Sequence, residues 1–182
     1  MDRKEAAAQK NRIFGLVYRY LLAVLFSLSK LSLFYFIFTP LTVYSSYFLL
    51  SLVYPAMLEG NAILINDVVI LLNEACIAGS AYFLLALLNL TTPGIKALKR
   101  VGIFLYGASI LLVFNIIRIF LLSIALVSGV VFYDVLHILI WYVFSVLVVV
   151  MIWLFSIKRF KIVGIPILSD IIYLKNLIKR RR

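Results

Sequence analysis

Long apolar segments, separated by short loops rich in lysine and arginine, are the feature that most limits how this chain can fold. Residues 101–127 carry a single charged side chain, that of Arg118. A helix needs about 20 apolar residues to cross the ~30 Å hydrocarbon core of a bilayer. Only 14% of the residues are charged, whereas soluble domains carry about 25%. The sequence therefore predicts an integral membrane protein with one compact domain.

Basic residues indicate which ends of the apolar segments face the cytoplasm. Lysine and arginine cluster before residue 13, at 96–100, and after residue 157. Because cytoplasmic loops carry an excess of these residues, we expect both termini in the cytoplasm of a multi-pass cell-membrane protein. The first apolar segment is expected to stay as a helix and not to be cleaved. The net charge of +11 then favours anionic membrane lipids as a partner, and no nucleic acid.

The predicted fold is an all-α integral membrane protein with about four transmembrane helices. We expect them at about 13–38, 77–90, 101–127 and 135–157. A residue before proline disfavours helical backbone, so Thr39-Pro40 is predicted to end the first helix. Arg19 and Lys30, inside the first apolar segment, are interpreted as side chains that snorkel to the membrane surface.

Residues 41–58 are apolar but contain several tyrosines and serines. They form either a further span or an interfacial helix at the outer surface. We favour the interfacial helix, because a further span would place Cys76 on the cytoplasmic side.

Two short runs of β-favouring residues, 62–65 and 68–72, flank Asn66-Asp67 and predict a β-hairpin at 61–72. Open sheet edges are not stable in lipid, so the hairpin is expected outside the bilayer. We therefore expect the chain to divide into a membrane-embedded domain, 1–158, and a basic amphipathic cytoplasmic tail, 159–182.

Three residues carry the chemistry that the sequence offers. Cys76 and His137 are the only cysteine and histidine of the chain. A cysteine thiolate is a nucleophile, and a histidine can take its proton and later protonate a leaving amine. Arg118 lies in an apolar segment, where a charge is costly and points to function. It would supply positive charge to the thiolate or to the oxyanion of a tetrahedral intermediate.

The helical rise of about 1.5 Å per residue predicts that these three residues lie at a similar depth. By this rise, Arg118 lies roughly 27 Å above the basic loop at Arg100, and His137 about 31 Å above Lys158. Cys76 precedes the second apolar helix, whose dipole is expected to favour the thiolate. All three are therefore expected near the outer membrane interface.

Three further residues are candidates for supporting roles. Asn115 lies one turn before Arg118 and shares its helix face, where it would orient the guanidinium or donate to the same oxyanion. Asp134 would orient His137 or face water, and Glu74 is an acid of the outer face. Each main residue also has a plain structural interpretation: Cys76 as packing, His137 as an interfacial anchor, and Arg118 as a snorkelling cation.

The motifs around these residues are Asn-Glu-Ala-Cys-Ile-Ala-Gly-Ser at 73–80 and Asn-Ile-Ile-Arg at 115–118, followed by His137. In this order the chain resembles the archaeosortase/exosortase family over about residues 39–153, and Cys-x-Ala-Gly is closer to its archaeal branch. The resemblance implies a membrane-embedded cysteine transpeptidase with Cys76, Arg118 and His137 as catalytic residues.

The resemblance also implies substrates and acceptors. The substrates would be surface proteins with a C-terminal signal made of a short motif, a transmembrane helix and a basic cluster. The cleaved protein would pass to an amine, a lipid-linked acceptor or water. We expect no cofactor and no metal, and a single cysteine excludes an internal disulfide. The alternative is a non-catalytic membrane assembly or transport protein in which Arg118 binds an anionic ligand.

Overall fold

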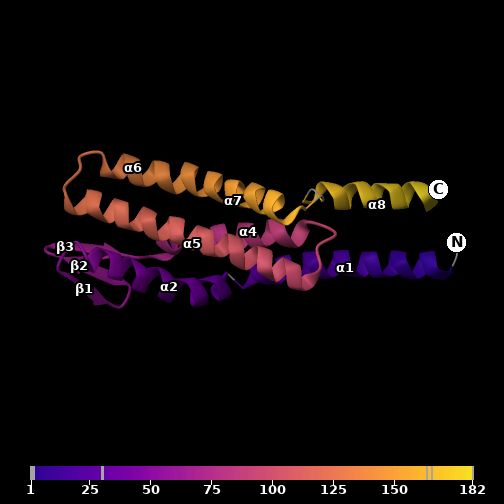
Figure 1. Cartoon of the computed structure of the whole chain (residues 1–182), viewed down its shortest axis with the longest axis horizontal. Coiled ribbons are helices and arrows are strands. Elements are labelled where there is room, and N and C mark those ends of the chain that lie inside the picture. Colours follow the sequence, from indigo (N-terminus) through magenta and orange to yellow (C-terminus); the bar gives the residue numbers. More distant parts are fainter. Residues whose placement is uncertain (1–2, 30, 163, 165, 182) are drawn as a thin grey trace.

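The computed structural model describes residues 3–29, 31–162, 164 and 166–181, so the prediction for Lys30 lies outside the described residues. Helices dominate, and a small antiparallel sheet follows the second helix (Figure 1). In chain order the elements are α1 (Arg3–Leu28), α2 (Ser32–Ser51), β1 (Ala56–Glu59), β2 (Ala62–Ile65), β3 (Val68–Leu71), α3 (Glu74–Ile77), α4 (Gly79–Thr91), α5 (Ala97–Val127), α6 (Tyr133–Leu139), the π-turn η1 (Ile140–Phe144), α7 (Ser145–Phe160) and α8 (Leu168–Arg181).

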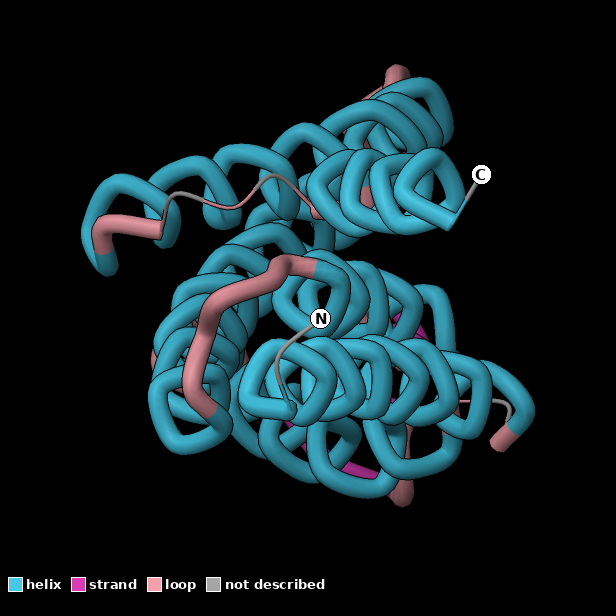
Figure 2. The backbone as a smooth tube through the Cα atoms, turned by 90° about the vertical axis from the view of Figure 1, so that its right-hand side faces the viewer, coloured by secondary structure: helices cyan, strands magenta, loops and turns pink. Residues whose placement is uncertain are grey.

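The molecule is a long bundle with two distinct ends. Helices α2, α4, α5 and α7 pack alongside one another, and α1 continues the line of α2 (Figure 1). We call the end that carries β1–β3 the sheet end. The opposite end, where α1 begins and α8 lies, is the terminal end. Seen from the terminal end, the strands lie behind the helices (Figure 2).

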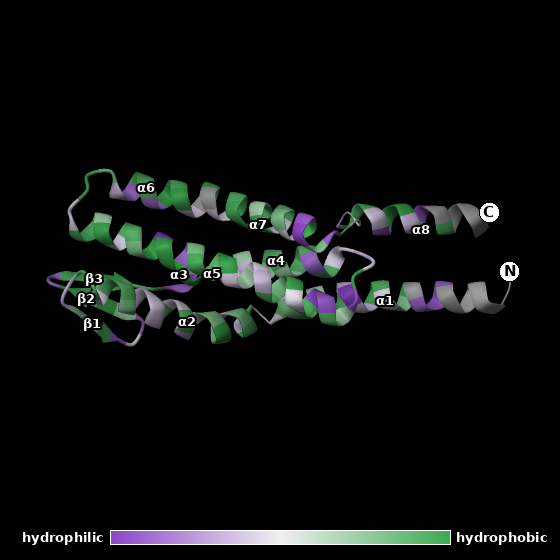
Figure 3. Ribbon diagram, in the orientation of Figure 1, coloured by the Kyte–Doolittle hydropathy of each residue, from purple (hydrophilic) through white to green (hydrophobic). Residues whose placement is uncertain are grey.

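Three helices of the described chain are long and apolar enough to cross a membrane: Gln9–Leu28 within α1, Ser32–Ser51 and Ala97–Val127. Apolar residues cover most of α5, α6 and α7, and large apolar side chains remain exposed on their outer surfaces (Figure 3). A soluble protein rarely exposes so large an apolar surface. The structure therefore agrees with a helical membrane protein.

The predicted fourth helix is a helical segment that is not uniform. It comprises α6, η1 and α7, and each of these pieces is shorter than 18 residues. The π-turn takes up one more residue per turn than an α-helix does. This irregularity was not predicted from the apolar pattern.

The core lies where α4, α5 and α7 meet. Tyr82 and Leu85 of α4 are almost fully buried, and so are Ile103 of α5 and Val149 of α7. Gly107 allows the closest approach, because a β-carbon there would lie 2.9 Å from Leu85 and 3.2 Å from Ile152. Small residues at helix contacts are typical of membrane bundles, since van der Waals packing drives their association.

The predicted β-hairpin is present. Strand β2 pairs antiparallel with β3, and the two-residue link starts at Asn66, whose φ is 51°. Asparagine tolerates this left-handed backbone better than most residues do. Strand β1 was not predicted: it pairs with the other edge of β2 and extends the hairpin to three strands. The buried side chains Ile63 and Ile65 attach the sheet to the core.

Two predictions for the first third of the chain are wrong. Pro40 lies inside α2, and the helix instead breaks before Ser32, where Leu31 has a φ of 60°. A separate surface helix over 41–58 is also absent, because 41–51 belong to α2 and 56–59 form β1. Membrane helices tolerate proline when neighbouring elements compensate for the missing hydrogen bond, which explains the first error.

Arg19 does not snorkel freely. Its Nη2 donates to both carboxylate oxygens of Asp170 in α8, at 3.0 and 2.9 Å, and its Nη1 donates to the carbonyl of Leu90 at the end of α4. The two ion-pair side chains are 14% and 6% exposed. The tail helix is therefore fastened to α1 and α4.

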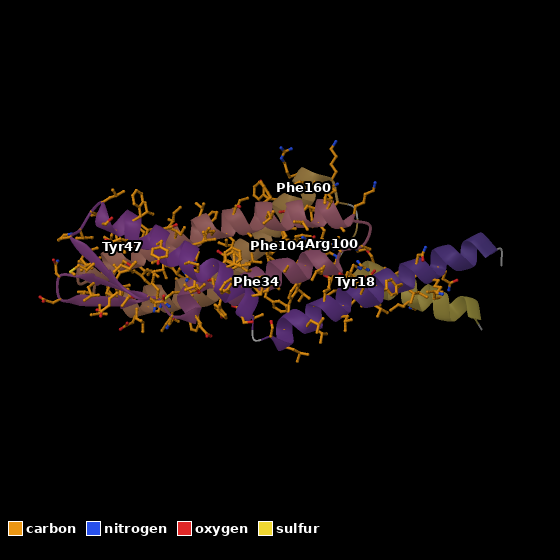
Figure 4. All side chains as sticks on the ribbon, turned by 90° about the horizontal axis from the view of Figure 1, so that it is seen from below. Tyr18, Phe34, Tyr47, Arg100, Phe104 and Phe160 are labelled. Atoms are coloured by element: carbon orange, nitrogen blue, oxygen red, sulfur yellow. The ribbon has the colours of Figure 1, made fainter. Side chains whose placement is uncertain are left out.

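A second arginine fastens the terminal end of α4. Arg100, labelled in Figure 4, donates to the carbonyls of Asn89, Thr92 and Ile95, and the Asn89 amide donates back to the Arg100 carbonyl. The last carbonyls of a helix have no partner within the helix. Arg100 supplies partners for them and closes α4 against the start of α5.

Candidate active site

Cys76 lies in the one-turn helix α3, between the sheet and α4. The side chain of Asn73 caps this turn by accepting a 3.2 Å hydrogen bond from the backbone N–H of Cys76. Ala78 then adopts a φ of 60° and separates α3 from α4. The predicted second helix therefore begins with an isolated turn, which alters the environment that the sequence predicts for Cys76.

The thiol of Cys76 is half-buried. Its Sγ lies 4.0 Å from the carbonyl oxygen of Leu71, the last residue of β3, to which the thiol donates a weak hydrogen bond. The expected help from a helix dipole is small here, because α3 has four residues and dipole effects need aligned turns. Positive charge near the thiol comes instead from a side chain of α5.

Asn115 and Arg118 both reach the segment that carries Cys76. The Asn115 amide nitrogen donates to the carbonyl oxygen of Cys76 at 2.8 Å. Arg118 Nη2 donates to the same oxygen at 3.2 Å and to the carbonyl of Ala75 at 3.4 Å. Residues one turn apart on α5 thus hold one turn of backbone in α3, as their shared helix face allows.

The rest of the Arg118 guanidinium faces α7 and α4. Its Nη1 donates to Ser145 Oγ at 3.2 Å. Its Nε is buried and has no hydrogen-bond partner among the described residues. No described carboxylate forms an ion pair with it. Its positive charge is instead close enough to the Cys76 thiol and the Tyr82 hydroxyl to interact electrostatically with both.

A cavity of about 90 Å³ adjoins this cluster. Asn115, Arg118 and Ser145 provide the polar part of its lining. The remaining lining is apolar and comes from the α3–α4 junction, α4, α5, the π-turn and α7: Ala78, Ala81, Leu111, Phe114, Ile140 and Val148. Several convergent polar groups in an otherwise apolar cavity are typical of ligand sites.

His137 comes close to the cluster through Tyr133. The two rings stack with centroids 5.7 Å apart and an interplanar angle of 17°. Tyr133 is close enough to Cys76 that a thiolate there would interact electrostatically with the Tyr133 hydroxyl. Among the described side chains, no hydrogen bond joins His137 to Cys76. The structure therefore brings Cys76, Asn115 and Arg118 into contact, and among the described residues His137 contacts Tyr133 but makes no hydrogen bond to this cluster.

Glu74 and Asp134 do not join the cluster. Both side chains are exposed, and each lies in the first turn of its short helix, α3 or α6. Glu74 is close enough to Tyr35 of α2 to interact electrostatically. Within the described part of the chain, Asp134 makes no hydrogen bond to His137. Acidic side chains in a first turn favour the helix N-terminus, which explains both positions without a role in the site.

The sequence analysis missed three contributors to the site. Asn73 caps α3, Tyr133 stacks on His137, and Ser145 accepts from Arg118. Two had a usable signal: Asn73 is a typical N-cap residue, and Tyr133 lies four residues before His137 on a helix. Ser145 had no such signal in the sequence, because the direction of its side chain depends on the π-turn.

No group of three or more histidine, cysteine, aspartate or glutamate side chains in the described part of the chain could hold a metal ion. The chemistry available at the site is that of a thiol, an imidazole, an amide and a guanidinium. A comparison of the chain with protein-family models, curated proteins and solved structures finds no match.

Proposed function

We propose that this protein is a membrane-embedded cysteine transpeptidase of the archaeosortase type. It cleaves surface proteins near a C-terminal transmembrane signal and transfers them to an amine, a lipid-linked acceptor or water. The observation that carries the proposal is the contact of Asn115 and Arg118 with the carbonyl of Cys76. A nucleophile, a fixed positive charge and an amide donor thereby come together from segments far apart in the sequence.

The chemistry follows from the roles of these groups. His137 takes the proton of the Cys76 thiol, and the thiolate sulfur attacks the carbonyl carbon of the scissile peptide. The negative charge that develops on the carbonyl oxygen is stabilised by Arg118. When the C–N bond breaks, the protonated His137 gives its proton to the leaving amine, and a thioester remains on Cys76. The acceptor then attacks the thioester and restores the thiol.

In this proposal His137 must approach Cys76 when substrate binds. Catalytic hydrogen bonds are often long in the absence of substrate and tighten in the complex. Tyr133 stacks on the imidazole, so we expect the two rings to rotate together when His137 moves toward the thiol. The cavity beside Arg118 would take the part of the substrate that flanks the cleaved bond.

The proposed topology has four spans and places the sheet end outside. Because α2 continues the line of α1, we count the two helices as one outward crossing (Figure 1); α3–α4 then crosses inward, α5 outward and α6–α7 inward. Both termini are then cytoplasmic, as the basic loops require. Cys76 is the only thiol of the chain. A small membrane-impermeant maleimide should therefore label it in intact cells, and labelling only after the cytoplasmic face is opened would reverse the topology.

The direct test of the function is capture of the acyl-enzyme. Wild-type protein would be expressed with a candidate substrate from the same genome that carries a C-terminal signal, and Cys76 would be examined by mass spectrometry. We expect a thioester that hydroxylamine releases, together with loss of the signal from the substrate. Cys76→Ala should give neither product. A Cys76→Ala variant that still processes the substrate would end the proposal.

The orphan Nε of Arg118 favours a second candidate, a non-catalytic protein that binds an anionic ligand. A buried guanidinium without a carboxylate partner is a ready site for a carboxylate or phosphate. This candidate predicts that Cys76→Ala keeps full function in cells while Arg118→Gln loses it. The transpeptidase predicts that both variants lose function.

A further inference from the structure

We propose that Ser145 is a positioning residue, which holds the Arg118 guanidinium against the Cys76 segment. The π-turn Ile140–Phe144 places Ser145 on the same side of the helix as His137. The inference rests on the proposed function for its processing readout. It adds to that function a residue that none of the sequence motifs contains.

The first argument is the hydrogen-bond chain through Ser145. Its Oγ accepts from Arg118 Nη1 at 3.2 Å and donates to the carbonyl of Ile140 at 3.4 Å. A hydroxyl has one proton to donate and lone pairs to accept with, so both bonds form at once. The serine therefore links the cation on α5 to the backbone of the π-turn.

The second argument is the register of the helix. His137 and Ser145 are eight positions apart, and an α-helix turns by about 100° per residue. An unbroken α-helix would place them about 80° apart around its axis. The π-turn takes up one extra residue, which reduces this angle to about 20°.

The contacts agree with that register. Tyr133 stacks on His137 and interacts with Cys76, while Ser145 binds Arg118, which itself binds the Cys76 carbonyl. Ser145 contacts the candidate site from one face of the helical segment α6–η1–α7, and the register places His137 on the same side. π-turns inside α-helices occur frequently at functional sites for this reason.

Loss of the Ser145 hydroxyl removes the acceptor that holds Nη1 of Arg118. The guanidinium then keeps its two bonds to the Ala75 and Cys76 carbonyls, but nothing fixes it on the side of α7. Its planar fork has to stay in one orientation to present positive charge beside the thiol. Ser145 thus acts through Arg118 and need not touch the substrate.

The test compares two variants of nearly equal shape in the full-length protein. Ser145→Thr keeps the hydroxyl, whereas Ser145→Val removes it. Ser156→Ala is the matched control, because Ser156 lies on the same helix, is buried, and donates at 2.8 Å to Ile152 of its own helix. Two readouts are taken in native membranes: kcat and KM for substrate processing, and the rate at which N-ethylmaleimide alkylates Cys76.

We expect Ser145→Val to lower kcat by about tenfold or more, as loss of a hydrogen bond to a charged group does, with KM unchanged. Alkylation of Cys76 should slow in the same variant, since the guanidinium keeps its bonds to the two carbonyls but is no longer fixed in one orientation beside the thiol. Ser145→Thr and Ser156→Ala should behave as wild type in both readouts. Equal behaviour of the Val and Thr variants in both readouts would overturn the inference.

The two readouts separate this inference from the proposed function. If wild-type protein processes its substrate and Ser145→Val changes neither rate, the positioning role fails and the transpeptidase stands. If no variant, wild type included, processes any candidate substrate, but Ser145→Val alone slows alkylation, the positioning role stands and the transpeptidase fails.

Discussion

The side-chain amide of Asn115 donates a 2.8 Å hydrogen bond to the backbone carbonyl of Cys76, across 39 positions of sequence. This contact fixes the position of α3 along the axis of α5. Together with Arg118 Nη2, it satisfies a carbonyl that the one-turn helix α3 leaves without a partner of its own, as helix ends do. In the low-dielectric interior of a membrane protein, such a carbonyl is costly if left alone.

Asn115→Ala should therefore destabilise the protein by about 1 kcal/mol, because the Cys76 carbonyl loses one of its two donors and keeps Arg118. The measurement is the free energy of unfolding in a detergent titration. Ser109→Ala is the control, since the exposed Ser109 hydroxyl donates to its own helix at Leu105 and should be nearly neutral. A change in stability equal to that of the control would mean that Asn115 does not hold α3.

Arg118→Lys should abolish most processing while the protein still folds. A lysine keeps the charge, but one ammonium cannot replace a planar fork that binds two carbonyls and a hydroxyl. Processing is measured as the fraction of substrate that has lost its C-terminal signal, and folding as the amount of protein in the membrane. Near-normal processing would show that the charge alone suffices and that the guanidinium geometry is irrelevant.

His137→Gln should reduce processing by about 10²–10⁴-fold, the usual cost of losing a general acid–base group. Glutamine keeps a polar side chain at the same place, so a mere interfacial anchor would tolerate it. Asp134→Asn is the control, because Asp134 is exposed and lies outside the cluster. Wild-type processing by His137→Gln would remove the base from the proposed mechanism.

Gly79→Ala should disturb the start of α4. A β-carbon at Gly79 would lie 2.6 Å from the ring of Tyr35, so the ring or the helix has to move, at a cost of about 1–3 kcal/mol. The double variant with Tyr35→Ala should recover part of this loss, as coupled neighbours do. Thermal stability measures the cycle. Gly102→Ala, where the added carbon meets nothing within 4 Å, should be neutral or stabilising.

Asp170→Asn should release α8 from the bundle. The Arg19–Asp170 pair is nearly buried, and removing one partner of such a pair typically costs about 3–5 kcal/mol. Limited proteolysis should then cut between α7 and α8 faster than in wild type, while the rest of the bundle stays intact. An unchanged rate of cleavage would indicate that packing, and not the ion pair, retains the tail.

Apolar segment length and turn residues predicted the main elements of the fold. The hairpin around Asn66-Asp67 and the helix at 101–127 follow from local patterns, and both are present. Pro40 misled the analysis because its cost inside a helix depends on neighbouring helices, which a sequence window does not contain. Strand β1 was not predicted for a similar reason. It pairs with the edge of β2 that β3 leaves free, and a local sequence window does not contain that pairing.

The candidate site was predicted only in part. Helical rise predicted that Cys76, Arg118 and His137 lie at one depth, and helix spacing placed Asn115 on the face of Arg118. The structure joins Cys76, Asn115 and Arg118, but among the described residues it shows no hydrogen bond from His137 to them. The π-turn was not foreseeable, since nothing in the apolar run around 140–144 distinguishes it from regular helix. The π-turn determines the direction in which the Ser145 side chain points. The role of Ser145 could therefore not be predicted from the sequence. Asp170 was missed because its partner, Arg19, lies at the other end of the chain.

The Arg19–Asp170 ion pair also bears on the order in which the molecule is assembled. Its partners are 151 positions apart, so it closes only after almost the whole chain has been synthesised. Synthesis proceeds from the N-terminus, and α1 therefore reaches the membrane with Arg19 still lacking its carboxylate. Until α8 arrives, the most favourable place for that charge is the hydrated membrane surface. Of the described helices, α1 is thus made before the others but completes its contacts only when α8 has been made.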